Sequence, residues 1–213
     1  MTQRAGPGPT TTEIEVVVDG GRLVVRKRRL VADPTRPRRT APVPAVEAAA
    51  AEARWLAAAR HPGAVALRRF APATATIELV HAGGATMASG CWSPPVAARL
   101  LASACRTVTE LHRRRLIHGK LTADHLVVAP SGRSEVVLCS PLGTAGDPGD
   151  DRRALAAIAA GLLEGWADDA GADVGWMAPV WRRPPTGWVD VVEALAGPGG
   201  LVTAARLLDR LAR

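Results

Sequence analysis

The chain has 213 residues, of which 47% are hydrophobic and 22% charged, so it can bury a core and is not expected to be disordered. Its formal net charge of +7 is uneven, because residues 1–42 carry nine basic and four acidic side chains while the rest is nearly balanced. No apolar run is long enough to cross a bilayer, and no apolar signal segment opens the sequence. We therefore expect a cytoplasmic protein without a membrane span.

The cysteines indicate neither zinc nor redox chemistry. Cys91, Cys105 and Cys139 are widely spaced, and none belongs to a C-x-x-C motif or to a Cys/His cluster. We expect reduced, buried residues that act as small hydrophobic side chains, and no metal ligands.

Residues 1–80 predict a small β-rich region with one helix. Valine-rich runs around a glycine turn and two further β-type runs predict four strands, at Glu13–Val18, Arg22–Val31, Ala64–Phe70 and Thr74–Val80. The proline-rich stretch 33–45 predicts a loop. The alanine-rich segment Val46–Arg60 predicts a helix that stops at the following His-Pro-Gly.

Residues 85–213 predict a mostly helical region. Apolar residues at helical spacing predict helices at Val96–Arg115, Asp151–Leu163, Val189–Leu195 and Leu201–Leu211. A short hairpin is expected between Leu126–Val128 and Val136–Cys139, and a Trp/Pro-rich connector over 176–188. The order of strands, helix, strands and then helices indicates an α+β protein.

The segment 111–128, LHRRRLIHGKLTADHLVV, resembles the catalytic loop of protein kinases, where the pattern is H-R-D-L-x-x-x-N. Aligned without gaps, His118 stands at the motif histidine, Lys120 at the catalytic aspartate and His125 at the asparagine. Ser140 falls after the hairpin, where the aspartate of the D-F-G motif belongs.

Further landmarks follow in the order that the kinase family has. VVRK, ending at Lys27, is similar to the V-A-I-K strand, and Glu52 is similar to the helix glutamate that pairs with its lysine. GPGP, with Gly6 and Gly8, resembles a remnant of the glycine-rich loop. Asp151 resembles the start of the buried helix that supports the catalytic loop.

The resemblance implies one kinase-like domain over residues 1–213, most similar to bacterial Ser/Thr protein kinases. A reduced β-rich N-lobe would span 1–80, a hinge 81–84 (within ELVHAGG) and a truncated helical C-lobe 85–213. The C-lobe is truncated because only ten residues separate Ser140 from Asp151, which leaves no room for an activation segment.

The substitutions imply a pseudokinase. Phosphoryl transfer needs an aspartate to orient the attacking hydroxyl, and an aspartate and an asparagine to hold magnesium. Lys120, His125 and Ser140 supply a cation and two neutral groups instead, so we expect no catalytic residue and no metal site. A divergent phosphotransferase that recruits Asp124 or Asp147 is the enzyme alternative.

The expected role is therefore regulatory or scaffolding, with a protein partner. Lys27, Glu52, Gly6 and Gly8 are the candidate nucleotide-binding residues, and the sequence leaves open whether ATP binds weakly without magnesium or not at all. His118 and Asp151 are expected to be structural.

The basic segment Arg22–Arg39 has two interpretations. It is most simply a solvated sheet edge and loop, and we do not expect nucleic acid as a partner because the segment lacks interleaved aromatic residues. A basic nucleic-acid-binding protein is the third alternative. The late tryptophans, at 166, 176, 181 and 188, are expected to pack under the helices, with an exposed docking ridge as the alternative.

Overall fold

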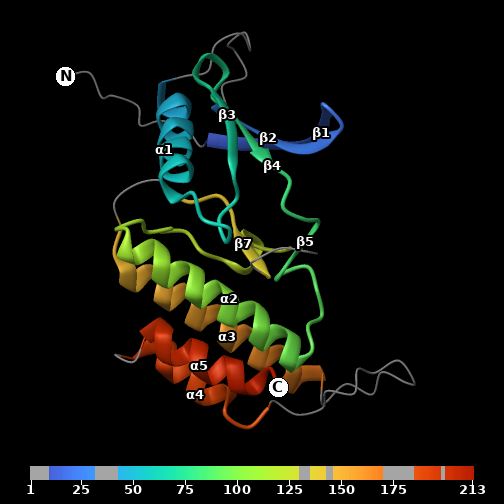
Figure 1. Ribbon diagram of the computed structural model, residues 1–213, viewed down its shortest axis with the longest axis vertical. Coiled ribbons are helices and arrows are strands. Elements are labelled where there is room, and N and C mark those ends of the chain that lie inside the picture. The colour runs from blue at the N-terminus through green and yellow to red at the C-terminus, as the bar shows by residue number, and fades with distance from the viewer. Residues whose placement is uncertain (1–9, 32–42, 130–134, 143–145, 170–184, 198–199) are drawn as a thin grey trace, which may run out of the picture.

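The protein is described by a computed structural model over residues 10–31, 43–129, 135–142, 146–169, 185–197 and 200–213. The structure is mixed α+β, as the order of elements predicts. A four-stranded sheet and helix α1 (Val43–Ala59) lie at one end of the long axis, and helices α2 to α5 lie at the other (Figure 1). A small three-stranded sheet lies between them.

The larger sheet is antiparallel, with strand order β1-β2-β4-β3. Its strands are β1 (Thr10–Asp19), β2 (Arg22–Val31), β3 (Leu67–Ala71) and β4 (Thr76–Val80). Gly20 and Gly21 connect β1 to β2 with φ angles of +57° and +74°. Both angles are positive, so the turn needs residues without a Cβ, and the predicted hairpin is confirmed.

The interpretation of the basic segment as a sheet edge is wrong for its β2 part. β2 pairs with β1 on one side and with β4 on the other, so it is an inner strand. Carboxylates on the neighbouring strands pair with its charged side chains: Arg26 forms ion pairs with Glu15 on β1 and with Glu78 on β4. Residues 32–39 of the segment lie outside the described residues.

Helix α1 starts three residues before the predicted segment and covers one face of the larger sheet. A short 3-10 helix, η1 (Pro72–Thr74), joins β3 to β4.

The smaller sheet has order β5-β6-β7, with β5 (Ala85–Thr86), β6 (Leu126–Val128) and β7 (Val136–Leu138). The β6–β7 pairing confirms the second hairpin.

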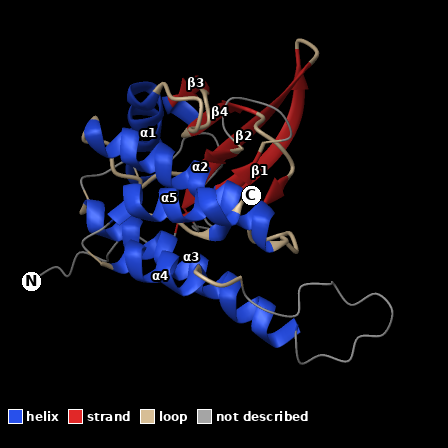
Figure 2. Ribbon diagram, turned by 60° about the horizontal axis from the view of Figure 1, so that its bottom comes forward, coloured by secondary structure: helices blue, strands red, loops and turns tan. Residues whose placement is uncertain are grey.

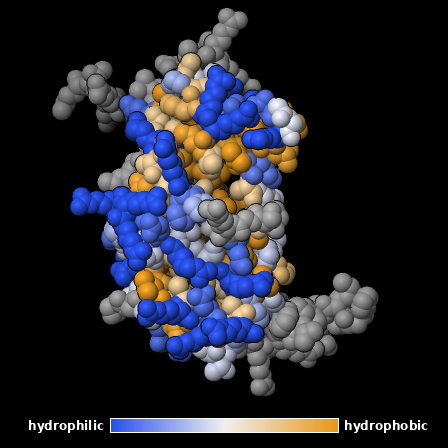
Figure 3. Space-filling model, in the orientation of Figure 1, coloured by the Kyte–Doolittle hydropathy of each residue, from blue (hydrophilic) through white to orange (hydrophobic). Residues whose placement is uncertain are grey.

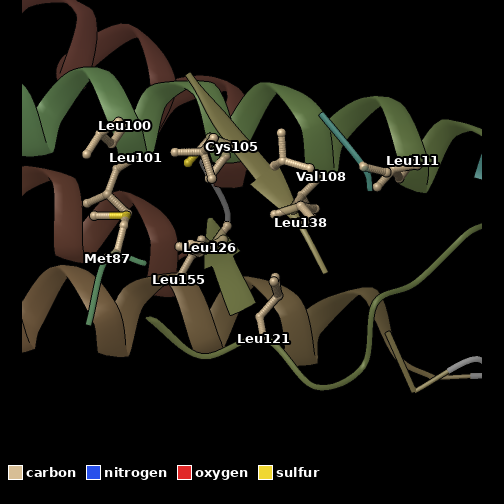
Figure 4. Packing of buried hydrophobic residues seen from close by; sticks show 14 of the residues in the cluster. Met87, Leu100, Leu101, Cys105, Val108, Leu111, Leu121, Leu126, Leu138 and Leu155 are labelled. Atoms are coloured by element: carbon tan, nitrogen blue, oxygen red, sulfur yellow. The ribbon is translucent and has the colours of Figure 1, made fainter. Parts of the chain in front are cut away.

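The four later helices pack together on one side of the molecule (Figure 2). They are α2 (Pro94–Arg113), α3 (Pro148–Asp169), α4 (Trp188–Ala196) and α5 (Gly200–Leu211). Two prolines open α2, where missing N–H groups cost nothing. Figure 4 shows side chains of α2, of β6 and β7, and of α3 meeting in one core, with Leu126 and Leu138 between the helices.

Trp166 and Trp188 are packed inside this core, as expected. Their rings meet edge to face with centroids 4.7 Å apart, and Trp188 Nε1 donates a hydrogen bond to the carbonyl of Ala159. Trp176 and Trp181 lie outside the described residues. In the described part of the chain, no helix is long and apolar enough to cross a membrane.

The cysteines are free thiols, but they are not all buried. Cys105 is buried in α2, Cys139 is half-buried and Cys91 is exposed. The expectation of three buried side chains is therefore wrong for Cys91, which lies in a loop before α2.

Candidate functional site

The centre of the candidate site is a buried ion pair between β2 and α1. Lys27 Nζ donates to both carboxylate oxygens of Glu52, at 2.8 and 3.0 Å, and to Ser140 Oγ at 3.0 Å. Lys27 is 5% exposed and Glu52 is fully buried. An ammonium group has three N–H donors, so all three have acceptors here.

The backbone places these residues together for simple reasons. Lys27 is opposite Ile14 and Ile77 in the register of the sheet, so its side chain shares their face, which α1 covers. Arg26, the preceding residue, is on the opposite face. Glu52 lies on the buried side of α1, about two turns before the helix ends at Ala59. Lys27 and Glu52 are therefore buried partners and not solvated surface charges.

A second cation completes the cluster. Arg29 donates to Glu52 Oε2 over 2.8 Å from two residues further along β2. Two positive side chains therefore share one buried carboxylate, which leaves the cluster with a net charge of +1. Arg29 was not among the predicted site residues, although its spacing from Lys27 puts both side chains on one face of a strand.

The loop that resembles the catalytic loop is held by Asp151. Its carboxylate accepts hydrogen bonds from the backbone N–H groups of His118 and Gly119, at 2.9 and 2.8 Å, and from His112 Nε2 at 2.9 Å. Burial alone would raise the pKa of Asp151, but these three donors outweigh it and hold the pKa below its usual value. Gly119 has φ +72°, a conformation that favours glycine.

His118 is a structural side chain in the middle of the site. Its Nε2–H donates to the carbonyl of Cys139 over 2.8 Å, and its ring lies edge-on against Trp55. Its Nδ1 has no hydrogen-bond partner within the described residues. Burial lowers the pKa of His118 to about 4, so the ring is neutral at physiological pH.

The three substituted positions lie around this loop. His125 Nδ1 donates to the carbonyl of Lys120, and the backbone carbonyl of His125 accepts from Cys139, the residue before Ser140. Burial lowers the pKa of His125, and the ammonium groups of Lys120 and Lys27 lower it further. Lys120 itself is exposed, and Ser140 has the uncommon φ of +60°.

Within the described residues, neither carboxylate proposed as a substitute forms an ion pair with Lys27. Asp147 Oδ1 accepts from the backbone of Gly149 at the start of α3, and its carboxylate lies near Arg153, so it stabilises the helix start. Asp124 is exposed on the short 3-10 helix η2 (Ala123–His125).

Two further points concern the phosphate-loop candidates and a metal site. Gly6 and Gly8, the candidate phosphate-loop residues, lie outside the described residues. Among the residues that the structure describes, no group of three or more His, Cys, Asp and Glu side chains could hold a metal ion. The side chains of Lys120, His125 and Ser140 do not fit magnesium, because an ammonium, an imidazole and a neutral hydroxyl are poor ligands for a metal that prefers carboxylate oxygens.

The comparisons with known proteins add no family. A scan against protein-family models finds no match, and no curated protein sequence matches the chain.

Proposed function

We propose that this chain is a catalytically inactive, protein kinase-like protein that acts in regulation or scaffolding. The observation that carries the proposal is the hydrogen bond between Lys27 and Ser140 beside an intact Lys27–Glu52 ion pair. Active kinases keep the same strand lysine and helix glutamate, but a magnesium-binding aspartate stands where this chain has Ser140. The Lys27–Glu52 ion pair is therefore present, whereas position 140 lacks the carboxylate that would bind magnesium.

The arrangement of elements supports a two-lobed kinase-like fold. A sheet that carries the lysine, a helix that carries the glutamate and a set of helices built around α2 and α3 follow one another along the chain. The small β6–β7 hairpin brings Ser140 back from the helical region to Lys27. In this proposal residues 1–80 form the N-lobe, 81–84 the hinge and 85–213 the truncated C-lobe.

The substitutions remove the chemistry of phosphoryl transfer. A lysine ammonium at position 120 cannot accept the proton of an attacking hydroxyl. Ser140 and His125 cannot neutralise the phosphate charge through magnesium, a contribution comparable to single electrostatic terms of about 3–4 kcal/mol in other enzymes. The contacts of Asp147 at the start of α3 argue against the phosphotransferase alternative.

One observation favours weak nucleotide binding without magnesium. Ile14, Val16 and Val18 alternate along β1 on the sheet face that also carries Lys27, and they are 55–72% exposed together with Leu23 nearby at 50%. Figure 3 shows apolar surface over the strands in the upper half of the molecule. An exposed apolar strip next to two cations suits a base with attached phosphates. Because Lys27 already has three acceptors, a phosphate must share or displace Ser140, so the affinity is low.

The test combines activity with binding. The full chain is incubated with radiolabelled ATP and magnesium, with generic acceptors and with itself, and no transfer above background is expected. Thermal unfolding is then followed with ATP, with and without magnesium, because a ligand that binds only the folded state raises the midpoint. A magnesium-independent rise that Lys27→Met abolishes supports the proposal. Transfer that Lys27→Met abolishes overturns it.

A reversal variant sharpens the test. Ser140→Asp restores a carboxylate beside Lys27, and it should make the ATP-induced stabilisation depend on magnesium. Ser89→Asp places the same charge on an exposed loop and is the matched control, with no such change expected. A magnesium-dependent rise in the unmodified chain contradicts the loss of the metal site.

A further inference from the structure

Strand β1 is a free edge of the larger sheet. Within the described residues it pairs only with β2, because it stands first in the strand order β1-β2-β4-β3. It is ten residues long and contains no proline. Figure 2 shows the β1–β2 hairpin extending outward beyond the helices. A long edge strand of this kind presents a row of backbone donors and acceptors to a further strand.

The hydrogen bonds of β2 show which backbone groups of β1 point to the free edge. The carbonyl of Leu23 accepts from the N–H of His81, which follows β4, over 3.3 Å, so Leu23 uses the β4 side. Leu23 is opposite Val18 in the hairpin register. Opposite residues of an antiparallel pair either bond to each other or both point away, and the two kinds alternate along the strands. The N–H and C=O groups of Val18, Val16 and Ile14 therefore point away from β2.

The side chains of the same three residues form an apolar row. Ile14, Val16 and Val18 lie on one face of the sheet and are 55–72% exposed. Val16 continues a line of apolar residues that crosses the sheet through Val25 and Leu79. A further strand with apolar residues at alternate positions would extend this line and cover the exposed side chains.

The opposite face of β1 carries carboxylates in a row of alternating charge. Glu13 and Glu15 are both exposed on this face. The sheet register places four residues in one row across the four strands: Arg69, Glu78, Arg26 and Glu15. Glu78 has a basic residue on either side, whereas Glu15 has one on the β2 side alone within the described strands. A basic residue on an added strand would therefore continue the pattern of the row.

We propose that the free edge of β1 binds an extended segment of a partner protein as a fifth strand, and that this segment alternates apolar and basic residues. Its backbone bonds to the free groups of Ile14, Val16 and Val18, and its basic side chains lie beside Glu13 and Glu15. Backbone bonds of this kind provide affinity, and the alternating side chains provide specificity. The inference goes beyond the proposed function and does not depend on nucleotide binding.

A second copy of β1 fits this edge less well. One antiparallel register places all three apolar residues opposite apolar residues of the second copy, and it also places Glu13 opposite Asp19 of that copy. Like charges directly opposite each other destabilise a strand pair. The charge of β1 therefore favours a basic segment over self-association.

The test uses a fluorescein-labelled peptide of about nine residues in which Val and Lys alternate. Its fluorescence anisotropy is measured against the full chain at low salt, and we expect saturable binding. Val16→Pro removes an N–H at the free edge and none that bonds to β2, so it should weaken binding by about tenfold or more. Urea denaturation shows whether this variant is folded.

A charge variant tests the carboxylates independently of the backbone. Glu13→Gln/Glu15→Gln should weaken binding by about fivefold or more. The matched control Glu47→Gln/Glu164→Gln removes two exposed carboxylates from α1 and α3 and should leave the affinity unchanged.

Two further probes decide the chemistry of the partner. A peptide in which Val and Glu alternate should bind about tenfold more weakly, because its carboxylates meet those of β1. No binding of the first peptide, equal affinity of folded Val16→Pro, equal affinity of the two double variants, or equal binding of the acidic peptide overturns the proposal. So does self-association of the chain, followed by sedimentation velocity, that Val16→Pro abolishes.

Discussion

Two buried carboxylates, Glu52 and Asp151, organise the two halves of the candidate site in different ways. Glu52 is fully buried and pairs with the side-chain cations of Lys27 and Arg29. Asp151 is 1% exposed and accepts mainly from backbone N–H groups and from His112. One carboxylate therefore positions charge, and the other positions the backbone of a loop.

The two carboxylates make different demands on the residues around them. The loop around His118 needs only N–H donors and a carboxylate to keep its shape, and all of these are present. In the kinase-like protein that we propose, positions 120, 125 and 140 would need groups that hold metal or accept a proton, and Lys120, His125 and Ser140 supply neither. The proposal of a binding scaffold without a phosphoryl-transfer reaction rests on this contrast.

Removal of the Glu52 charge should have the largest effect on stability. Glu52→Gln keeps the volume of the side chain but leaves two cations without their buried anion. Breaking a buried pair in this way typically costs about 3–5 kcal/mol of unfolding free energy. Urea denaturation at neutral pH measures this loss of unfolding free energy. The control is Glu47→Gln, at an exposed position on the same helix. Equal midpoints for the two variants would show that the charge cluster does not stabilise the fold.

Asp151→Asn should have the next largest effect. The amide keeps one acceptor, so at least one of the donors on His118, Gly119 and His112 loses its partner in a buried place. We expect a loss of roughly 2–3 kcal/mol, from the cost of an unpaired buried donor and a lost charged hydrogen bond. Asp150→Asn, exposed on the same helical turn, is the control and should stay within about 0.5 kcal/mol.

The pH dependence of Asp151 has a definite sign. Its folded pKa is below the unfolded value, so its stabilisation is present above about pH 4 and is lost as pH falls through the folded pKa. In Asp151→Asn the free energy of unfolding, measured by urea denaturation, should fall less steeply as the pH is lowered below about 4. If it falls as steeply as in the unmodified chain, other carboxylates cause the loss of stability in acid.

Much of this organisation follows from local patterns. The valine-rich strands around Gly20-Gly21, the alanine-rich α1 and the apolar spacing of α2 each determine their own element. These are short-range signals of alternation, helix propensity and turn chemistry, so the sequence carries them directly. The pairing of Lys27 with Glu52 was expected from the resemblance to protein kinases, and no local pattern indicates it.

The remainder depends on contacts between distant segments. That β2 is an inner strand depends on β4 returning beside it, and the partners of Arg29 and His112 depend on how α1 and α3 pack. β5 has only two residues, too few for alternation to be visible. No periodic pattern in one segment records a neighbour from another, which explains why these features were missed.

His118 should make folding sensitive to mild acid. Its folded pKa of about 4 is below the usual value of 6.5, so the folded state resists protonation. The stabilisation from the neutral ring is full above about pH 6.5 and falls as pH is lowered toward 4. The loss should be on the order of 2 kcal/mol, with the lowered pKa values of His125 and His61 acting in the same direction.

Urea denaturation at several pH values between about 7 and 4 checks this expectation. His118→Gln keeps a donor for the carbonyl of Cys139 but cannot be protonated, so it should reduce the slope in this range. His81→Gln, outside the site, is the control. If His118→Gln keeps the full slope, the buried ring is not the group that senses acid.

Arg26→Ala should have the smallest effect and tests burial directly, because Arg26 is next to Lys27 on β2 but on the other face of the sheet. Its guanidinium pairs with Glu15 and Glu78, with its side chain 40% and that of Glu15 57% exposed. Water and salt screen such pairs, so we expect no clear change in the urea midpoint, and none at all in about 1 M NaCl. A loss that matches Glu52→Gln and persists in salt would mean that the solvent-facing network stabilises the sheet as much as the buried cluster does.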